Sequence, residues 1–400
     1  MVPDRLSGPG RPDIIADPRA LSGAHVKLAI LTSSLPPAPV GGAEHQALET
    51  ARRLAARGHE ITVFARRLPS GTPRVAREHG VTWVRSWAPG IPLLRFGAHA
   101  ASFLRDWKAF GGPKNDLVLA YQMIINGFLA SLTRTPMLTW IRDEGEARLI
   151  ERPSTRGMAL RVLTRSRRVL FQADGIRKTV LDTLESTRGR DARSALEART
   201  DVLANGIALG PEPSREGRDD VLYLSRLYPQ KGVDVLLEAM RRIPDPPPLR
   251  IVGDGPLRAA LEEQARGLPV TFVGHVPLQS VRAQLERARF LVFPSRWEGF
   301  PNVILEAMDR GLAVVATDVG AVREIVAHGE TGYVVPPGDP EALALRIREL
   351  WNDPDTADRM GRLARERVRA YDWERHLDRL EAILDASLAE ERPAAYGSSP

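Results

Sequence analysis

Short runs of apolar residues alternate along this chain of 400 residues with longer segments in which apolar positions recur every three or four residues. The first run, at 25–31, is followed by a Gly-Gly pair, a helical pattern that ends near residue 57, and a second run at 61–65. Strand, glycine loop, helix and strand in this order is the expected opening of a parallel sheet. We predict further strands at 81–84, 117–120, 136–141, 169–172 and 201–203.

The alternation resumes after a stretch rich in Gly, Pro and charge, at 206–220, which we interpret as a linker. Further strands are predicted at 221–224, 249–252, 270–273, 290–294 and 313–317, with helices between them. Because 400 residues exceed one typical core, we predict an α/β protein with two parallel-sheet domains across a cleft. The predicted parts are a flexible leader at 1–25, a first domain at 26–205, the linker, a second domain at 221–371, an amphipathic helix at 372–391 and a tail at 392–400.

The composition, 43% hydrophobic and 26% charged, is that of an ordinary globular protein. The absence of cysteine excludes disulfides and cysteine-ligated metals. No run of 18 apolar residues occurs, and residues 1–25 lack the apolar centre of a secretory signal. We therefore expect a cytoplasmic protein, with a peripheral position on the inner face of a membrane as one option.

Positive charge is concentrated in the first half of the chain. Residues 1–200 carry 31 Lys and Arg against 18 Asp and Glu, a net +13, whereas residues 201–400 carry 25 against 32, a net −7. A basic face can dock on anionic lipid headgroups, although a solvated helix face is the default interpretation. No nucleic-acid motif accompanies the charge, so we expect no nucleic-acid partner. The basic positions are Arg52, Arg53, Arg57, Arg66, Arg67, Arg161, Arg165, Arg167 and Arg168.

Two carboxylates, Glu298 and Glu306, are separated by seven residues where a predicted strand passes through a loop into a helix. In a doubly wound sheet, ligands bind beyond the carboxyl ends of the strands, where helix N-termini point. Backbone N–H groups there can hold an anion, and the carboxylates can accept hydrogen bonds from hydroxyls. Phosphate together with a polyol suggests a nucleotide sugar.

Three other loops follow predicted strands. Arg226 and Lys231 share one loop, and two cations at a strand end suit a diphosphate. Gly41 and Gly42 can bring backbone close to a phosphate, although a tight turn without a ligand explains this pair equally well. The loops that contain Gly253, His275 and Val276 are ordinary turns when taken singly, and together they could shape a base pocket.

These motifs, in this order, resemble the family 4 retaining glycosyltransferases of the GT-B fold, the glycosyl transferases group 1. The resemblance covers residues 26–388 and rests on Gly-Gly-Ala-Glu44, Arg226…Lys231-Gly232, Gly253-Asp-Gly-Pro256, Glu298-x7-Glu306 and the glycine pattern from Gly311 to Gly332. It implies two Rossmann-like domains, with the C-terminal helix crossing back to the first. It also implies transfer of a sugar from a nucleotide-diphosphate donor, most often a UDP- or GDP-sugar, to a glycan or lipid-linked acceptor.

The resemblance also assigns roles. Arg226 and Lys231 would hold the diphosphate with the Gly41–Gly42 backbone, and Glu306 would bind the ribose. Glu298 would hold the transferred sugar, together with backbone at Phe300, Pro301, Asn302 and Val303. Gly253, His275 and Val276 would lie on the donor side. No metal and no pyridoxal phosphate are expected, and transfer would proceed by front-face attack with retention.

One segment departs from the family pattern. A His-Asp pair often ends a strand of the first domain, whereas this chain has Trp140-Ile-Arg-Asp-Glu-Gly145. We expect Arg142 or Asp143 to take that place on the acceptor side. The alternatives are a nucleotide-sugar epimerase, a phosphorylase that would need pyridoxal phosphate on a lysine, and a non-catalytic nucleotide-sugar binder on the same fold.

Overall fold

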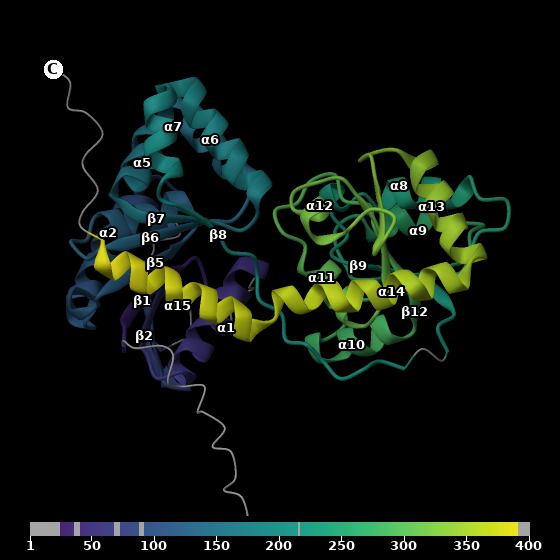
Figure 1. Ribbon diagram of the computed structural model, residues 1–400, viewed down its shortest axis with the longest axis horizontal. Coiled ribbons are helices and arrows are strands. Elements are labelled where there is room, and N and C mark those ends of the chain that lie inside the picture. The colour runs from purple at the N-terminus through teal and green to yellow at the C-terminus, as the bar shows by residue number, and fades with distance from the viewer. Residues whose placement is uncertain (1–24, 36–40, 68–72, 88–91, 215–216, 391–400) are drawn as a thin grey trace, which may run out of the picture.

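The computed structural model describes residues 25–35, 41–67, 73–87, 92–214 and 217–390 (Figure 1). Two parallel sheets form two halves that lie side by side. The first has eight strands in the order β3-β4-β2-β1-β5-β6-β7-β8, parallel except for β3, and the second has six parallel strands in the order β11-β10-β9-β12-β13-β14. The predicted α/β class with two Rossmann-like domains is confirmed.

The first half holds the strands β1 (Lys27–Thr32), β2 (Glu60–Arg67), β3 (Val75–Glu78), β4 (Val81–Trp87), β5 (Leu117–Tyr121), β6 (Met137–Ile141), β7 (Ser166–Phe171) and β8 (Thr200–Val202). Its α-helices are α1 (Gly42–Ala56), α2 (Pro92–Ala109), α3 (Phe128–Ser131), α4 (Arg148–Glu151), α5 (Pro153–Arg165), α6 (Asp174–Arg188) and α7 (Arg190–Glu197). Two short helical turns matter below, the π-helical η3 (Met123–Gly127) and the 3₁₀ turn η4 (Glu144–Glu146).

The second half holds β9 (Asp220–Leu224), β10 (Leu249–Val252), β11 (Val270–Gly274), β12 (Ala288–Phe293), β13 (Ala313–Thr317) and β14 (Gly332–Val335). Its α-helices are α8 (Val233–Arg241), α9 (Arg258–Gln264), α10 (Leu278–Glu286), α11 (Asn302–Asp309), α12 (Val322–Ile325), α13 (Pro340–Asn352) and α14 (Pro354–Val368). The last helix, α15 (Trp373–Ala389), lies on the first half (Figure 1).

Most of the central strands are buried on both faces, which is why their sequences are continuous apolar runs that the pattern detects. All the predicted strands have counterparts. Two strands were not predicted: β3 is a short edge strand with partly exposed residues, and β14 has only four residues and begins at a glycine. Neither presents the longer apolar run that identifies a buried strand.

The C-terminal helix α15 crosses back to the first half, as the GT-B resemblance implied (Figure 1). Its apolar face, from Trp373 to Leu384, belongs to the same buried cluster as residues of β1 and α1. Arg57, just after α1, donates to Asp378 at 2.8 Å and to Glu381 at 2.6 Å. These contacts tie the two ends of the described chain together.

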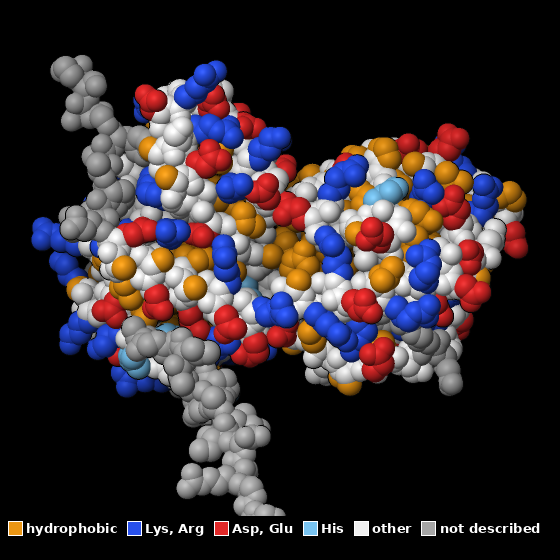
Figure 2. Space-filling model, in the orientation of Figure 1, with side chains coloured by type: hydrophobic (Ala, Val, Ile, Leu, Met, Phe, Trp, Pro, Cys, Tyr) orange, Lys and Arg blue, Asp and Glu red, His pale blue; other side chains and the backbone are white. Residues whose placement is uncertain are grey.

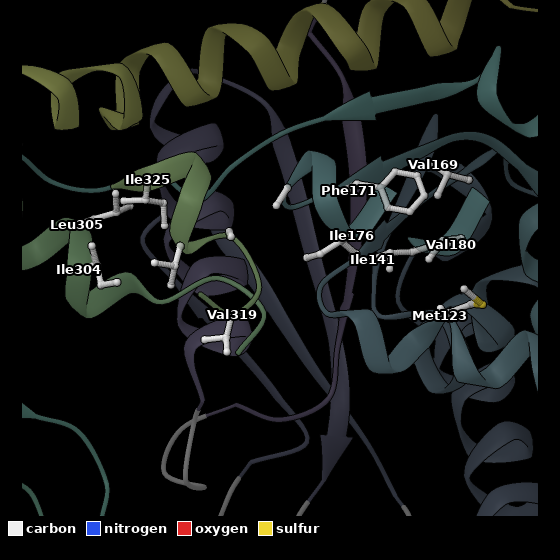
Figure 3. Packing of buried hydrophobic residues seen from close by; sticks show 14 of the residues in the cluster. Met123, Ile141, Val169, Phe171, Ile176, Val180, Ile304, Leu305, Val319 and Ile325 are labelled. Atoms are coloured by element: carbon white, nitrogen blue, oxygen red, sulfur yellow. The ribbon is translucent and has the colours of Figure 1, made fainter. Parts of the chain in front are cut away.

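A larger buried cluster combines residues of both halves. Figure 3 shows Ile304, Leu305, Val319 and Ile325 of the second half on one side, and residues of the first half, among them Ile141 and Phe171, on the other. Side chains of both halves therefore belong to one continuous apolar cluster. Such burial stabilises by about 25 cal/mol for each Å² of apolar surface removed from water.

Most of the basic side chains singled out in the first half form hydrogen bonds or ion pairs with other residues of the protein. Arg161 and Arg165 donate to the backbone carbonyls of Ser131 and Thr133, and Arg168 pairs with Asp201 at 2.8 Å and with Glu390. On the face shown in Figure 2, basic and acidic side chains are interspersed over both halves. In the part of the chain that the structure describes, no helix is both long and apolar enough to span a membrane.

Candidate active site

A cleft of about 450 Å³ lies where loops after the strands of the two sheets meet. The first half contributes mostly amides and backbone, together with Arg142 and Asp143, and the second half contributes the cations Arg226 and Lys231. Eleven of the predicted site residues line it: Gly41, Gly42, Arg142, Asp143, Arg226, Lys231, Glu298, Phe300, Pro301, Asn302 and Val303. The carboxyl ends of parallel strands share one edge of a sheet, which is why loops far apart in sequence converge here.

Lys231 and Glu298 form an ion pair within this cleft. The Lys231 ammonium contacts Glu298 Oε1, and the two side chains are only 11% and 12% exposed. Ser295 Oγ donates to the same carboxylate oxygen at 2.9 Å. Lys231 reaches this position because Gly232, with φ +66°, lets its loop approach the Pro294 carbonyl, which would lie 2.0 Å from any Cβ placed there.

Arg226 is an available cation on the same wall. Its side chain is exposed, and its guanidinium lies 5.2 Å from the centre of the Tyr228 ring. Among the described residues it has no carboxylate partner. An uncompensated guanidinium at the end of a parallel strand is placed to bind a phosphate in a bidentate manner.

Arg142 and Asp143 meet the second half directly. A Cβ on Gly299 would lie 2.6 Å from the Arg142 carbonyl oxygen and 3.2 Å from Asp143 Cβ, so the loop that follows Glu298 rests on these two residues. The Asp143 side chain is partly buried, and it has no hydrogen-bond or ion-pair partner in the described chain.

The Arg142 guanidinium is buried beneath the cleft. It lies 4.7 Å from the Trp140 ring and 5.3 Å from the Tyr121 ring, and Nη2 donates to Asn205 Oδ1 at 2.8 Å. Burial lowers the pKa of Arg142 to about 10. Arg142 therefore forms part of the floor, whereas Asp143 stands at the junction of the two walls.

Glu306 belongs to a second, neighbouring cavity of about 330 Å³. Asn302, one helical turn earlier on α11, lines both cavities, and Asn205 Nδ2 donates to its Oδ1 at 2.5 Å. Leu278, Val281 and Trp373 are among the apolar residues around Glu306. Burial raises the pKa of the Glu306 carboxyl. The two carboxylates of the motif thus line different, adjoining chambers, Glu298 the cleft and Glu306 the second cavity.

Three predicted donor-side residues line neither chamber. Gly253 permits a close approach, since a Cβ there would lie 1.9 Å from the carbonyl oxygen of Ser225, next to Arg226. The His275 side chain is exposed, and Val276 packs against the large apolar cluster. Gly253 thus acts on the loop that carries Arg226, and nothing in the geometry brings the His275 or Val276 side chain into either chamber.

Glu324 of α12 joins the two halves of the protein and was not predicted. Its carboxylate accepts from the backbone N–H groups of Gly175 at 2.8 Å and Asp174 at 3.0 Å, at the N-terminus of α6 in the other half (Figure 1). A carboxylate at a helix N-terminus is stabilised by the helix dipole. Arg367 donates to the Glu324 carbonyl at 2.8 Å. No spacing in the sequence signals a cap supplied from a remote domain.

Two parallel-sheet halves, a cleft at their strand ends and a returning C-terminal helix define the class of GT-B glycosyltransferases. Residues 41–206 match the family model described as glycosyl transferase 4-like domain, and residues 218–353 match glycosyl transferases group 1. The chain belongs to the family 4 glycosyltransferases, the glycosyl transferases group 1.

Individual relatives cover nearly the whole chain. It is 30% identical over 358 residues to phosphatidyl-myo-inositol mannosyltransferase of Mycolicibacterium smegmatis, covering 83% of this chain and 87% of that protein. It is 27% identical over 390 residues to glycogen synthase of Mycobacterium tuberculosis, covering 87% and 92%.

Solved structures with the same fold include sucrose-phosphate synthase from Thermosynechococcus elongatus, with a TM-score of 0.77, 23% identity and coverage of 91% and 99%. HepE of Anabaena in complex with UDP-glucose has a TM-score of 0.71, 20% identity and coverage of 90% and 100%.

Proposed function

We propose that this protein is a retaining hexosyltransferase that moves a sugar from a nucleotide-diphosphate donor, a UDP- or GDP-sugar, to a glycan or lipid-linked acceptor without a metal ion. The observation that carries the proposal is the grouping of Arg226, Lys231 and Glu298 in one cleft at the N-terminus of α11. The family membership gives the transferase class, and the UDP-glucose bound to HepE supports the donor class.

Donor binding would exchange partners within the cleft. The diphosphate would take the Arg226 guanidinium and draw the Lys231 ammonium away from Glu298. Glu298 would then accept hydrogen bonds from hydroxyls of the sugar, next to the backbone of Phe300 to Val303. The nucleoside would extend past Asn302 into the second chamber, where Glu306 would accept from the ribose. The Gly41–Gly42 backbone, at the start of α1, would cover the diphosphate.

Transfer would follow a front-face course. The acceptor hydroxyl oxygen forms the new bond to C1 on the face from which the diphosphate departs, and the C1–O bond to the diphosphate breaks. The departing phosphate oxygen takes the hydroxyl proton, and the products are a nucleoside diphosphate and a glycoside with the donor's anomeric configuration. Arg226, Lys231 and the α11 N-terminus stabilise the charge that develops on the leaving group, a role that a divalent metal plays elsewhere.

Two observations support the acceptor class. One relative is named for a phosphatidyl-myo-inositol acceptor, and the first half of the chain carries a net charge of +13, from 31 Lys and Arg against 18 Asp and Glu. We therefore propose a lipid-linked or cell-envelope polysaccharide acceptor, used at the inner face of a membrane that the protein visits from the cytoplasm. Asp143, at the junction of the walls, would lie on the acceptor side.

The test is turnover in the presence of a chelator. Purified protein is incubated with UDP- and GDP-sugars and with polyprenyl-linked, phospholipid and oligosaccharide acceptors, and nucleoside diphosphate release is followed. Nuclear magnetic resonance then gives the anomeric configuration of the product. Retention supports the proposal and inversion overturns the mechanism. An interconverted nucleotide sugar without release would identify an epimerase, and binding without either reaction would identify a binder. Glu298→Gln should keep nucleotide binding and lose transfer.

A further inference from the structure

Gln122 has a backbone conformation that glycine alone adopts without strain. Its φ is +73° and its ψ is +147°, at the carboxyl end of β5. Only one other non-glycine residue of the described ranges has a positive φ, His79 in the exposed turn between β3 and β4. Gln122 also opens the π-helical turn η3. Strained backbone and π-helical turns concentrate at functional sites, where the surroundings hold them in place.

A buried carboxylate holds this strained segment. The Met123 N–H, directly after Gln122, donates to Glu146, and the Arg142 N–H donates to the other oxygen of Glu146 at 2.9 Å. The Gln122 N–H itself donates to the Trp140 carbonyl at 3.0 Å. Glu146 thus ties the end of β5 to the end of β6, and both strand ends face the cleft.

The Gln122 side chain lines the cleft and is oriented by two neighbours. Ser33 Oγ donates to Gln122 Oε1 at 2.9 Å, and Asn126 Nδ2 donates to Ser33 Oγ at 3.3 Å and to the Tyr121 carbonyl at 2.6 Å. With Oε1 engaged, the amide presents its Nε2 hydrogens, which have no partner in the described residues. The Gln122 amide is thus a donor in the cleft wall, held in one orientation by its backbone and by Ser33, and it can bind a ligand without rearranging.

The charges of the two walls indicate which kind of ligand the Gln122 amide would bind. The cations, Arg226 and Lys231, are on the wall of the second half, where a diphosphate would bind. The opposite wall presents the amides of Gln122, Gln172 and Asn205. Its cation, Arg142, is buried and donates to Asn205, and the other charged side chain of this wall is the carboxylate of Asp143. This wall therefore suits a neutral hydroxyl better than a phosphate. Hydrogen-bonding sites of this kind select polar ligands sharply, because an unmatched donor in the site is costly.

We propose that Gln122 is an acceptor-binding residue: its Nε2 donates to a hydroxyl of the polyol acceptor, and Ser33 and Asn126 hold the amide in that orientation. This inference rests on the proposed glycosyl transfer and adds a subsite to it. The strained backbone lies at the strand end, and the residue that carries it lines the cleft.

The test uses four variants of the full chain. Gln122→Glu keeps the oxygen that Ser33 contacts and removes the donor, and Gln122→Ala removes both without adding charge. Gln122→Gly relieves the backbone strain, and His79→Gly is its matched control outside the cleft. Thermal unfolding, calorimetric binding of UDP and GDP, and transfer to the acceptor found for the native protein are measured, together with slow transfer to water.

We expect Gln122→Gly and His79→Gly to melt above the native protein, by about 2 °C or more, with transfer reduced only in the former. Gln122→Glu and Gln122→Ala should bind the nucleotide normally and lose about 3- to 10-fold in transfer, the effect of one neutral hydrogen bond. The loss should appear in the acceptor KM.

Full transfer by Gln122→Glu, or a Gln122→Gly variant that melts no higher than the native protein, overturns the inference. A native protein that binds neither nucleotide and transfers nothing overturns the proposed function instead, so the two failures are distinguishable.

Discussion

Replacing Lys231 by methionine tests the ion pair on which the proposed exchange of partners depends. Methionine keeps most of the aliphatic stem and removes the charge. Glu298 would then retain one hydrogen bond, from Ser295 Oγ at 2.9 Å, while its side chain stays only 12% exposed. Its negative charge would be left in the cleft without a compensating cation.

The expected cost follows from this burial. Breaking a buried pair by removing one partner costs about 3–5 kcal/mol, and because an open cleft admits water we expect the low end, about 3 kcal/mol. This corresponds to a melting temperature lower by about 6–12 °C for the affected domain. The double variant Lys231→Met/Glu298→Gln should recover about 2 kcal/mol of that loss, since no buried charge remains.

The assay is calorimetric unfolding of both single variants and the double variant. Arg296→Met is the control, because the nearby Arg296–Asp234 pair is exposed to 37% and 43% and should contribute less than about 1 kcal/mol. A Lys231→Met protein as stable as the native one, or a double variant no more stable than Lys231→Met, would refute the reasoning.

Three further predictions concern other contacts of the site. Arg226→Ala should weaken donor binding by about 10- to 100-fold, the effect of losing charge-assisted bonds worth about 1.5–3 kcal/mol, with an unchanged melting temperature; unaltered calorimetric affinity would contradict the diphosphate assignment. Glu324→Ala removes two bonds between the halves and should increase the radius of gyration of the free protein in small-angle X-ray scattering, whereas an unchanged radius would show that these bonds do not hold the cleft closed. Burial lowers the pKa of His376 to about 4, so the fold keeps this ring neutral and loses stability as the pH falls from about 6.5, the unfolded value, to about 4. Unfolding of His376→Gln across that range should lack this loss, and curves that run parallel to those of the native protein would contradict it.

The sequence was sufficient to predict those features that depend on residues close together in the chain. The apolar runs identified the parallel strands because those strands are buried on both faces. The sequence placed Arg226, Lys231 and Glu298 in the cleft correctly. Each follows a parallel strand in a loop, and such loops lie at the edge of the sheet where ligands bind. The same local reasoning missed β3 and β14, which are too short to form a pattern.

Other features depend on contacts between distant segments. The burial of Arg142 is set by Trp140, Tyr121 and Asn205, and a polar residue after a strand gives no sign of it. Glu306 follows Glu298 by eight positions, yet the turn of α11 directs it into another chamber. The positive φ of Gln122 could not be predicted, because this backbone conformation is expected at glycine and not at glutamine.

The most direct test of the central claim is calorimetric titration of the folded, metal-free protein with UDP-, GDP-, ADP- and dTDP-sugars. We predict binding of one base class in the presence of a chelator, with affinity lost in Arg226→Ala and nearly kept in Glu298→Gln. No binding to any of them, or binding that requires a divalent metal, would contradict the proposed donor site.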